Sequence, residues 1–165
     1  MNQMEDTPMM KKNFMNDDEY DSCDAHRQSW CEIPDYLDIK FYRCKICGQI
    51  MATIGKQANP LSCCGEEMSI LEPASVEASA EHHIPVYKKS GHKIKVQVGE
   101  IKHPMTPDHH IEWICMVTCC GVQWMPLSYD GEPEAEFRLK SDEKVLAIYS
   151  YCNIHGLWRG EEADD

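Results

Sequence analysis

The sequence predicts a mainly β protein in which a small cysteine-rich metal-binding domain precedes an antiparallel β-sandwich. Four of the ten cysteines form a Cys-x-x-Cys…Cys-Cys pattern, and the C-terminal half contains short apolar strands separated by turns. No apolar run approaches the roughly 18 residues of a membrane helix, and the N-terminus lacks the basic and apolar regions of a secretory signal. We therefore expect a cytoplasmic protein whose thiols bind metal or take part in redox chemistry.

Negative charge is concentrated at the two ends of the chain. The net charge is -12, residues 1–40 hold ten acidic against four basic side chains, and the last five residues, EEADD, hold four acids. We interpret these ends as solubilising segments, with a partly disordered N-terminal extension. Nucleic acid is excluded as a partner because phosphate binding needs a basic surface.

Composition divides the chain into five segments. The stretch EPASVEASAE is small and polar without an apolar period, so it predicts a linker. The expected segments are an acidic N-terminal extension (1–40), a four-cysteine domain (41–72), the linker (73–81), a β-sandwich domain (82–160) and an acidic tail (161–165).

The four-cysteine domain predicts a metal site. Cys44-x-x-Cys47, followed by Gly48, places two sulfurs on one side of a tight turn, and Cys63-Cys64 supplies two more. Four thiolates form a tetrahedral site suited to zinc or to a single iron. One interpretation is a zinc knuckle that only stabilises this small domain. The adjacent cysteine pair is unusual for that interpretation, because zinc ribbons usually close with a second Cys-x-x-Cys.

The C-terminal half predicts the strands of a sandwich. Ile94, Val96 and Val98 alternate with polar residues, which is typical of a half-buried strand. Longer apolar stretches predict further strands at 111–117, 122–127, 136–139 and 145–151. Turn sequences such as Asp130-Gly131 separate them, and this spacing favours a β-sandwich over βαβ units.

Histidines gather at the ends of these expected strands. A lone histidine on a strand is more often structural than a ligand, but this region contains six histidines and one cysteine next to prolines and glycines: His82, His83, His103, His109, His110, His155 and Cys152. Imidazole suits iron, zinc, copper or nickel, and a thiolate adds a soft ligand. In Cys152-x-x-His155 one turn presents both ligand types to a single ion.

Several motifs together resemble the desulfoferrodoxin family of two-iron superoxide reductases over roughly residues 41–160: FYRCKICG…SCCGEEM, EHHIPV, HPM, HHIEWI and YCNIHGLW. The resemblance implies a desulforedoxin-like first domain with one iron and an immunoglobulin-like sandwich with a catalytic iron. The implied ligands are Cys44, Cys47, Cys63 and Cys64 for the first iron, and His83, His103, His109, His155 and axial Cys152 for the second.

The resemblance also implies an activity. Such enzymes reduce superoxide to hydrogen peroxide with electrons from a rubredoxin-like donor, and the family resemblance suggests a homodimer. Glu81 matches the glutamate that occupies the open iron position after oxidation. At His82 the chain departs from the family pattern Glu-Lys-His, and an imidazole supplies the lysine's positive charge only when protonated. Five lysines against one glutamate in residues 82–103 either attract superoxide or merely solvate a strand.

Two other functional classes stay open from the sequence: a non-catalytic iron protein for electron transfer or redox sensing, and a zinc-stabilised interaction module.

Five cysteines lie outside the two candidate metal sites: Cys23, Cys31, Cys115, Cys119 and Cys120. Cys23-x-x-His26 with Cys31 is a weak third candidate metal group. We expect Cys115, which lies in an apolar strand, to be buried and to act as a small hydrophobic residue. The pair Cys119-Cys120 lies in a turn before Gly121.

Overall fold

The structure is a computed structural model that describes residues 38–56, 60–74 and 80–162, with the side chains of residues 80, 81, 161 and 162 excepted. The predictions for residues 1–37, including the candidate metal group of Cys23, His26 and Cys31, lie outside the described residues. So does the end of the acidic tail. Within the described part of the chain, no helix is long and apolar enough to cross a membrane.

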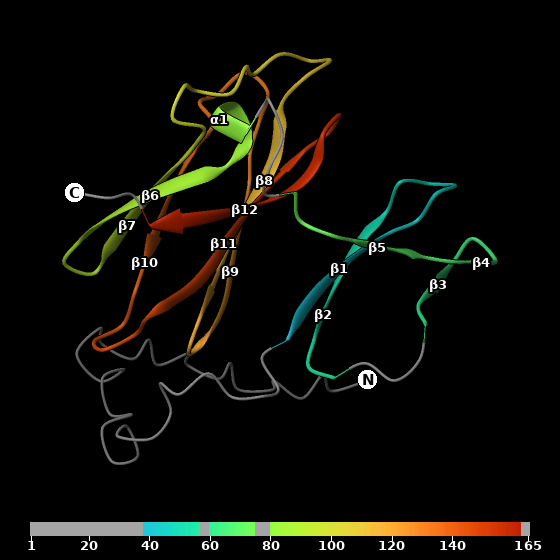
Figure 1. Cartoon of the computed structure of the whole chain (residues 1–165), viewed down its shortest axis with the longest axis horizontal. Coiled ribbons are helices and arrows are strands. Elements are labelled where there is room, and N and C mark those ends of the chain that lie inside the picture. The colour runs from blue at the N-terminus through green and yellow to red at the C-terminus, as the bar shows by residue number, and fades with distance from the viewer. Residues whose placement is uncertain (1–37, 57–59, 75–79, 163–165) are drawn as a thin grey trace, which may run out of the picture.

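The four-cysteine region forms a small sheet with a hairpin attached to it. Its central strand is β1 (Ile39–Arg43), flanked by antiparallel β2 (Ile50–Ile54) and β5 (Ser69–Leu71). The hairpin consists of β3 (Ser62–Cys63) and β4 (Glu66–Glu67). Figure 1 shows this unit beside the larger sandwich.

The larger unit contains seven strands: β6 (Pro85–Ser90), β7 (Lys93–Val98), β8 (Ile111–Thr118), β9 (Gly121–Pro126), β10 (Glu134–Arg138), β11 (Val145–Cys152) and β12 (Gly156–Glu162). Their order is β10-β7-β6-β12-β11-β8-β9. All neighbours are antiparallel except β12 and β6, which pair in parallel and join the two layers. A one-turn helix, α1 (Ala80–His83), precedes β6. The sequence did not predict α1, β6 or β12 individually.

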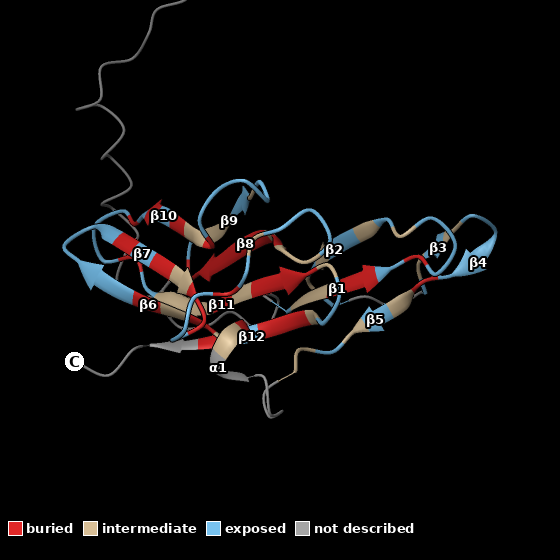
Figure 2. Cartoon of the chain, turned by 90° about the horizontal axis from the view of Figure 1, so that it is seen from above, coloured by how far each residue is buried: buried red, intermediate tan, exposed pale blue. Residues whose placement is uncertain are grey.

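The core of the sandwich follows the alternation seen in the sequence. Ile94, Val96 and Val98 on β7 are fully buried, while Lys93 and Lys95 on the opposite face of the strand are exposed. They pack against Ile114 and Met116 of the facing layer. Figure 2 shows buried segments on β7 and on β8 of the facing layer. The predicted mainly β fold class is confirmed.

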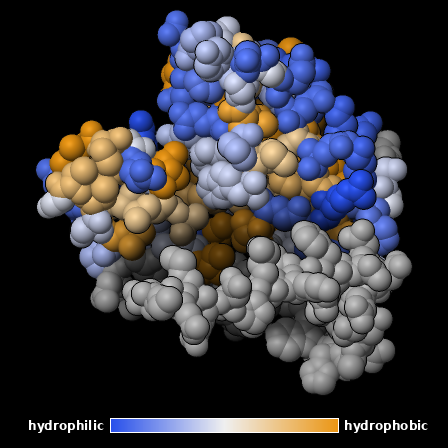
Figure 3. All heavy atoms as spheres, turned by 180° about the vertical axis from the view of Figure 1, so that it is seen from behind, coloured by the Kyte–Doolittle hydropathy of each residue, from blue (hydrophilic) through white to orange (hydrophobic). Residues whose placement is uncertain are grey.

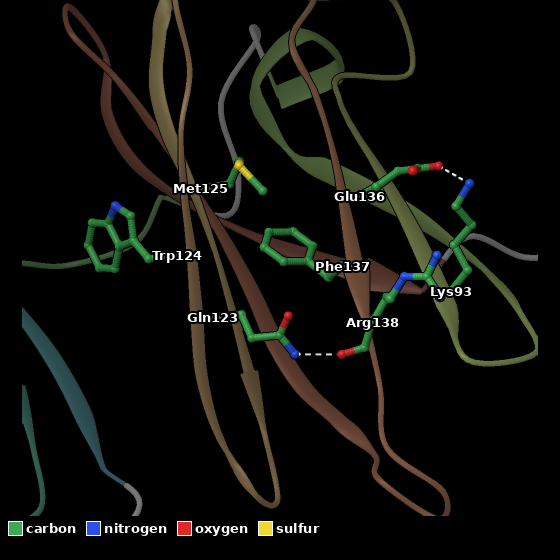
Figure 4. A pocket seen from close by; sticks show the side chains of 7 residues that line it. All are labelled: Lys93, Gln123, Trp124, Met125, Glu136, Phe137 and Arg138. Atoms are coloured by element: carbon green, nitrogen blue, oxygen red, sulfur yellow. Dashed lines mark hydrogen bonds and ion pairs between the residues drawn. The ribbon is translucent and has the colours of Figure 1, made fainter. Parts of the chain in front are cut away.

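The edge strands β9 and β10 approach each other where the sandwich closes. The Gln123 side chain donates to the carbonyl oxygen of Arg138 at 2.7 Å, and Lys93 on β7 pairs with Glu136 on β10. A pocket opens between these strands, with Trp124 at its rim (Figure 4). None of its lining residues is a histidine or cysteine, so this pocket is separate from the candidate metal ligands.

An aromatic contact packs the small sheet onto the sandwich. Phe41 of β1 is 2% exposed and stacks on Trp113 of β8, with 5.4 Å between ring centroids. Tyr149 of β11 meets the same ring edge-on at 5.1 Å. Leu71 and Leu157 belong to the same apolar cluster. The two units therefore share an apolar interface that the sequence analysis did not anticipate.

Candidate metal centres

The four cysteines of the small unit form one cluster. The sulfur of Cys63 lies 3.7 Å from that of Cys47 and 3.8 Å from that of Cys64, and all four sulfurs lie within 4.8 Å of one another. A tetrahedral ion with metal–sulfur bonds of about 2.3 Å separates its sulfurs by about 3.8 Å. The cluster therefore has the spacing of a tetrahedral four-thiolate site.

The protonation of these thiols also favours a cation. Backbone N–H groups, first that of Cys47, lower the pKa of Cys44 to about 7. The neighbouring sulfurs of Cys47 and Cys44 raise the pKa of Cys63 to about 12. Four thiolates at this spacing repel one another, so a bound cation is what allows all four to ionise together.

The second cluster is assembled from four separate parts of the sandwich. His83 ends α1, His103 follows β7 and His109 precedes β8. Cys152 ends β11, and His155 lies in the turn before β12. One ligand atom from each of these five residues lies within 4.8 Å of all the others. The topology thus brings together residues that are up to 72 positions apart in the chain.

The four imidazole rings form a square. Neighbouring rings around the square have centroids 4.5–4.9 Å apart and interplanar angles of 74–82°. Across the square, the centroids of His83 and His109 are 6.2 Å apart. Two ligands on opposite sides of an ion at about 2.1 Å each are about 4.2 Å apart, which fits the observed limit of 4.8 Å.

Specific nitrogens face the centre of this square. The Nδ1–H group of His103 donates a hydrogen bond to the carbonyl oxygen of Pro104 at 2.6 Å. The Nε2 atom of the same ring is therefore left to bind a metal. The Nε2 atoms of His103 and His109 are both buried and make no hydrogen bond within the described residues. His83 Nε2 and His155 Nδ1 point at each other across 2.8 Å. Unsatisfied buried nitrogens are costly, so these residues fit a metal ion.

Cys152 lies at the buried side of the square. Its side chain is fully buried, whereas His109 is half-buried and His155 is exposed. Burial raises the pKa of Cys152, and the backbone N–H groups of His155 and Ile154 act in the opposite direction. The N–H of His155 donates to the sulfur at 3.4 Å. A buried thiolate with such donors suits an inner ligand, and the site faces solvent at its His155 edge.

Neighbouring side chains hold the histidines in place. Trp158 stacks on the His83 ring at 4.8 Å and 20°, and the Ser150 hydroxyl donates to the His83 carbonyl oxygen at 2.9 Å. Gly99, at φ +83°, lets its loop approach α1, because a Cβ there would lie 2.7 Å from the His82 carbonyl oxygen. These contacts depend on side-chain directions across the fold, which the spacing of residues in the sequence does not reveal.

Asn153 connects the two halves of the site. Its side-chain oxygen accepts the N–H of His110 at 3.0 Å, and its amide donates to the carbonyl oxygen of Asp108 at 2.9 Å. These bonds fasten the loop of His109 to the turn that carries Cys152 and His155. The Nδ1–H group of His110 donates a hydrogen bond to the carbonyl oxygen of Thr106 at 3.0 Å. His110 lies outside the cluster, as expected.

The other residues that the sequence singled out are Glu81, His82 and the five lysines of residues 82–103. The side chain of Glu81 lies outside the described residues. A ring nitrogen of His82 lies 3.3 Å from the carbonyl oxygen of Ile101, and this residue is not part of the cluster. Three of the five lysines are neutralised by glutamates around β10, in the pairs Lys93–Glu136, Lys95–Glu134 and Lys102 with Glu132 and Glu134. The positive charge counted along the sequence is therefore largely offset.

The profile of the desulfoferrodoxin family matches residues 75–161, and the profile of its N-terminal domain matches residues 38–71. The chain belongs to the desulfoferrodoxin family. A desulfoferrodoxin from Nitratidesulfovibrio vulgaris is 39% identical over 130 residues, covering 78% of this chain and 99% of that protein. A desulfoferrodoxin homolog from Archaeoglobus fulgidus is 37% identical over 121 residues, covering 73% and 95%.

A solved structure agrees with this membership. The superoxide reductase from Treponema pallidum superposes with a TM-score of 0.66 at 36% identity, covering 75% of this chain and 98% of that one. The family resemblance inferred from sequence is thus confirmed. Family membership and the two clusters together indicate two iron centres, one with four cysteines and one with four histidines and a cysteine.

Removal of the metals should make stability depend on pH through His103. Burial lowers the pKa of His103 to about 4 in the folded protein, whereas an unfolded chain protonates it near pH 6.5. The unfolded state then binds more protons between these values, so the metal-free protein should lose stability as pH falls from about 6.5 to about 4. Denaturant titrations at several pH values measure this loss.

The variant His103→Gln isolates this contribution. It should reduce the pH dependence of the metal-free protein, whereas His92→Gln, in the exposed β6–β7 turn, should leave it unchanged. Equal pH dependence in the parent protein and His103→Gln would show that His103 takes no part.

Proposed function

We propose that this protein is a superoxide reductase that adds one electron to superoxide at a ferrous centre held by four histidines and a cysteine: His83, His103, His109, His155 and Cys152. The observation that carries this proposal is the square of imidazoles closed on its inner side by the buried Cys152. The chain's similarity to desulfoferrodoxins and to a superoxide reductase supports it.

Each side chain has a defined task in this reaction. The four histidines and Cys152 would hold a ferrous ion, which would supply the electron when bound, and a thiolate with neutral imidazoles would favour that transfer by donating electron density. Burial keeps His103 neutral by lowering its pKa to about 4. The N–H groups of His155 and Ile154 stabilise negative charge on Cys152. The exposed edge at His155 admits a small anion and water.

The overall stoichiometry is one superoxide, one electron and two protons to one hydrogen peroxide. Solvent at the exposed His155 edge of the site supplies the protons. The O–O bond is retained, and no oxygen is released. A reductase differs in this respect from a dismutase, which yields oxygen as well.

A single set of measurements separates this function from its alternatives. The purified protein should contain two irons per chain, absorb visible light when oxidised, and convert superoxide to peroxide without releasing oxygen. A zinc-stabilised interaction module would be colourless and would contain zinc. An electron carrier or redox sensor would contain coloured iron but would not consume superoxide catalytically. Either result would overturn the proposal.

We further propose a cytoplasmic homodimer that takes electrons from a rubredoxin-like donor. The small unit exposes several large apolar side chains, Ile46, Met51, Ile54 and Ile70, each at least 41% exposed. Figure 3 shows apolar residues gathered over this lobe. Apolar surface of this kind supports association with a partner. Sedimentation of the iron-loaded protein tests the dimer, and reduction by purified rubredoxin tests the donor.

Glu81 and His82 complete the proposed site. Glu81 would bind the open iron position after oxidation, and α1 carries its backbone next to His83. His82 would provide positive charge near that position. The described neighbourhood offers little other net charge, because Lys102 is already paired with two glutamates.

The variant His82→Lys should increase the second-order rate constant for superoxide at alkaline pH. Lysine keeps its charge to about pH 10, whereas a neutral imidazole attracts an anion weakly. Pulse radiolysis of the parent protein, His82→Lys and His82→Gln across pH 5–9 measures the effect. Three superimposable pH profiles would show that His82 has no role in attracting superoxide.

A further inference from the structure

We propose that Cys119 and Cys120 form a second redox site, which closes into a reversible disulfide when a hydroperoxide oxidises it. The pair occupies the turn between β8 and β9, where Thr118 pairs with Gly121 and leaves the two cysteines as the turn residues. β8 begins two residues after His109 and spans eight residues, or about 25 Å. The pair thus lies at the opposite end of the sandwich from the histidine cluster (Figure 1).

The two sulfurs are already in contact. Their separation is 3.9 Å, and both side chains are thiols in the structure. A disulfide requires a sulfur–sulfur distance of about 2.05 Å. The two cysteines lie outside the paired residues of β8 and β9, whose register ends at Thr118 and Gly121, so the two sulfurs can approach each other without breaking a rung of this ladder.

The pair is asymmetric in a way that assigns a role to each thiol. Cys120 is exposed and accessible to a small oxidant, whereas Cys119 is 7% exposed. The N–H of Lys144 donates to the Cys119 sulfur at 3.3 Å, and the N–H of Cys119 donates back to the Lys144 carbonyl oxygen at 3.0 Å. These bonds hold the inner sulfur beside its neighbour. Cys120 is therefore the attacking thiol and Cys119 the resolving thiol.

Neighbouring groups fix the turn itself. The Thr118 hydroxyl bonds the buried Glu143 carboxylate and accepts the N–H of Cys120 at 3.2 Å. The other Glu143 oxygen accepts the N–H of Lys140 at 2.7 Å. This network ties the β8–β9 turn to the segment before β11, so the two thiols are presented on a defined backbone.

The reaction balances with hydrogen peroxide as the oxidant. The Cys120 sulfur attacks one peroxide oxygen, the O–O bond breaks, and a sulfenic acid and one water form. The Cys119 sulfur then displaces the hydroxyl of the sulfenic acid as a second water and forms the S–S bond. The two sulfurs together lose two electrons, which reduce the peroxide to water. Added peroxide suffices, so this site does not depend on the proposed superoxide chemistry.

Adjacency makes this bond easy to reduce. Neighbouring residues have Cα atoms about 3.8 Å apart, whereas disulfides usually span 4.4–6.8 Å. A bond outside the favoured range is strained, and strained exposed disulfides are the labile ones. A dithiol reductant should therefore regenerate both thiols.

Peptide mass spectrometry tests the proposal on the full iron-loaded chain. The protein is treated with equimolar hydrogen peroxide, denatured, alkylated and digested with trypsin, which releases residues 103–138 as one peptide. Both turn cysteines should lose their alkylation, and the peptide should lose two hydrogen masses. Cys115, buried in the same peptide, should stay alkylated and serves as the internal reference. Dithiothreitol should restore both alkylations.

Two variants provide the controls. Cys120→Ser should abolish the two-hydrogen loss, and a Cys23→Ser/Cys31→Ser variant should retain it. A disulfide from Cys120 to another cysteine, or between two chains, would overturn the proposal. Oxidation of Cys120 to a sulfinic acid while Cys119 is still alkylated would also overturn the proposal. Full alkylation of both cysteines after peroxide treatment would overturn it as well.

Discussion

Replacing Cys152 with serine should remove the activity of the second centre and its thiolate-to-iron absorption band. The sulfur lies on the buried side of the imidazole square, and a serine oxygen donates much less electron density to iron. Loss of an outer partner of a metal site costs 10–100-fold, so loss of a ligand should lower the rate by more than about 100-fold. Stopped-flow rates with superoxide and visible spectra of the oxidised protein measure both effects.

Cys115→Ser is the matched control for this variant. Cys115 is also a fully buried thiol of the sandwich, and burial raises its pKa to about 12, but it is not in the cluster. It should leave the absorption band and the superoxide rate essentially unchanged. A band that persists in Cys152→Ser would mean that another cysteine ligates the iron, and would overturn the assignment of Cys152 as its thiolate ligand.

The side chains that the sequence singles out as ligands come together in the structure, and part of the reason is that each motif is local. Cys44-x-x-Cys47 and Cys152-x-x-His155 fix pairs of ligands within a turn, and the structure brings every predicted ligand into one of two clusters. The alternation of β7 was equally informative, since residues two apart share one face of a strand. The family resemblance supplied the grouping of distant motifs, which spacing alone does not provide.

Contacts between distant strands were not predictable in the same way. The lysines of β6 and β7 form a basic segment in the sequence, but the register Lys95↔Glu136 and Lys93↔Arg138 brings the acids of β10 alongside the lysines of β7. Strand β12 was missed because Gly156–Glu162 carries charges and two glycines. Its Gly160 is nevertheless required, because a Cβ there would lie 1.9 Å from the Pro85 carbonyl oxygen. Pairing of this kind depends on the tertiary structure rather than on local preference.

Replacing Cys44 with serine should remove the iron of the first centre and leave superoxide reduction at the second centre intact. Cys44 is 2% exposed, and the serine hydroxyl does not replace a thiolate whose pKa is lowered to about 7. The first-centre absorption should disappear. The rate with pre-reduced enzyme should change by less than about twofold, or about 0.4 kcal/mol in activation free energy.

The reason for this independence is the nature of the contact between the two units. They meet through apolar packing of Phe41 on Trp113 and Tyr149, and no ligand of one cluster belongs to the other. Loss of the first metal should loosen the β3–β4 hairpin, while β1 stays packed on the sandwich. Iron analysis should find one iron per chain, and thermal unfolding should show a lower midpoint for the small unit only.

Two assays of the Cys44→Ser variant distinguish stabilisation from electron relay at the first centre. Pulse radiolysis of pre-reduced protein follows only the second centre, whereas steady-state turnover with rubredoxin also requires electron entry. Normal values in both assays would assign the first iron a stabilising role. Slow turnover with a normal pre-reduced rate would make the first centre the entry point for electrons. Loss of the pre-reduced rate while the second iron remains bound would contradict the independence of the two centres, and Phe41→Leu would then test whether the aromatic contact couples them.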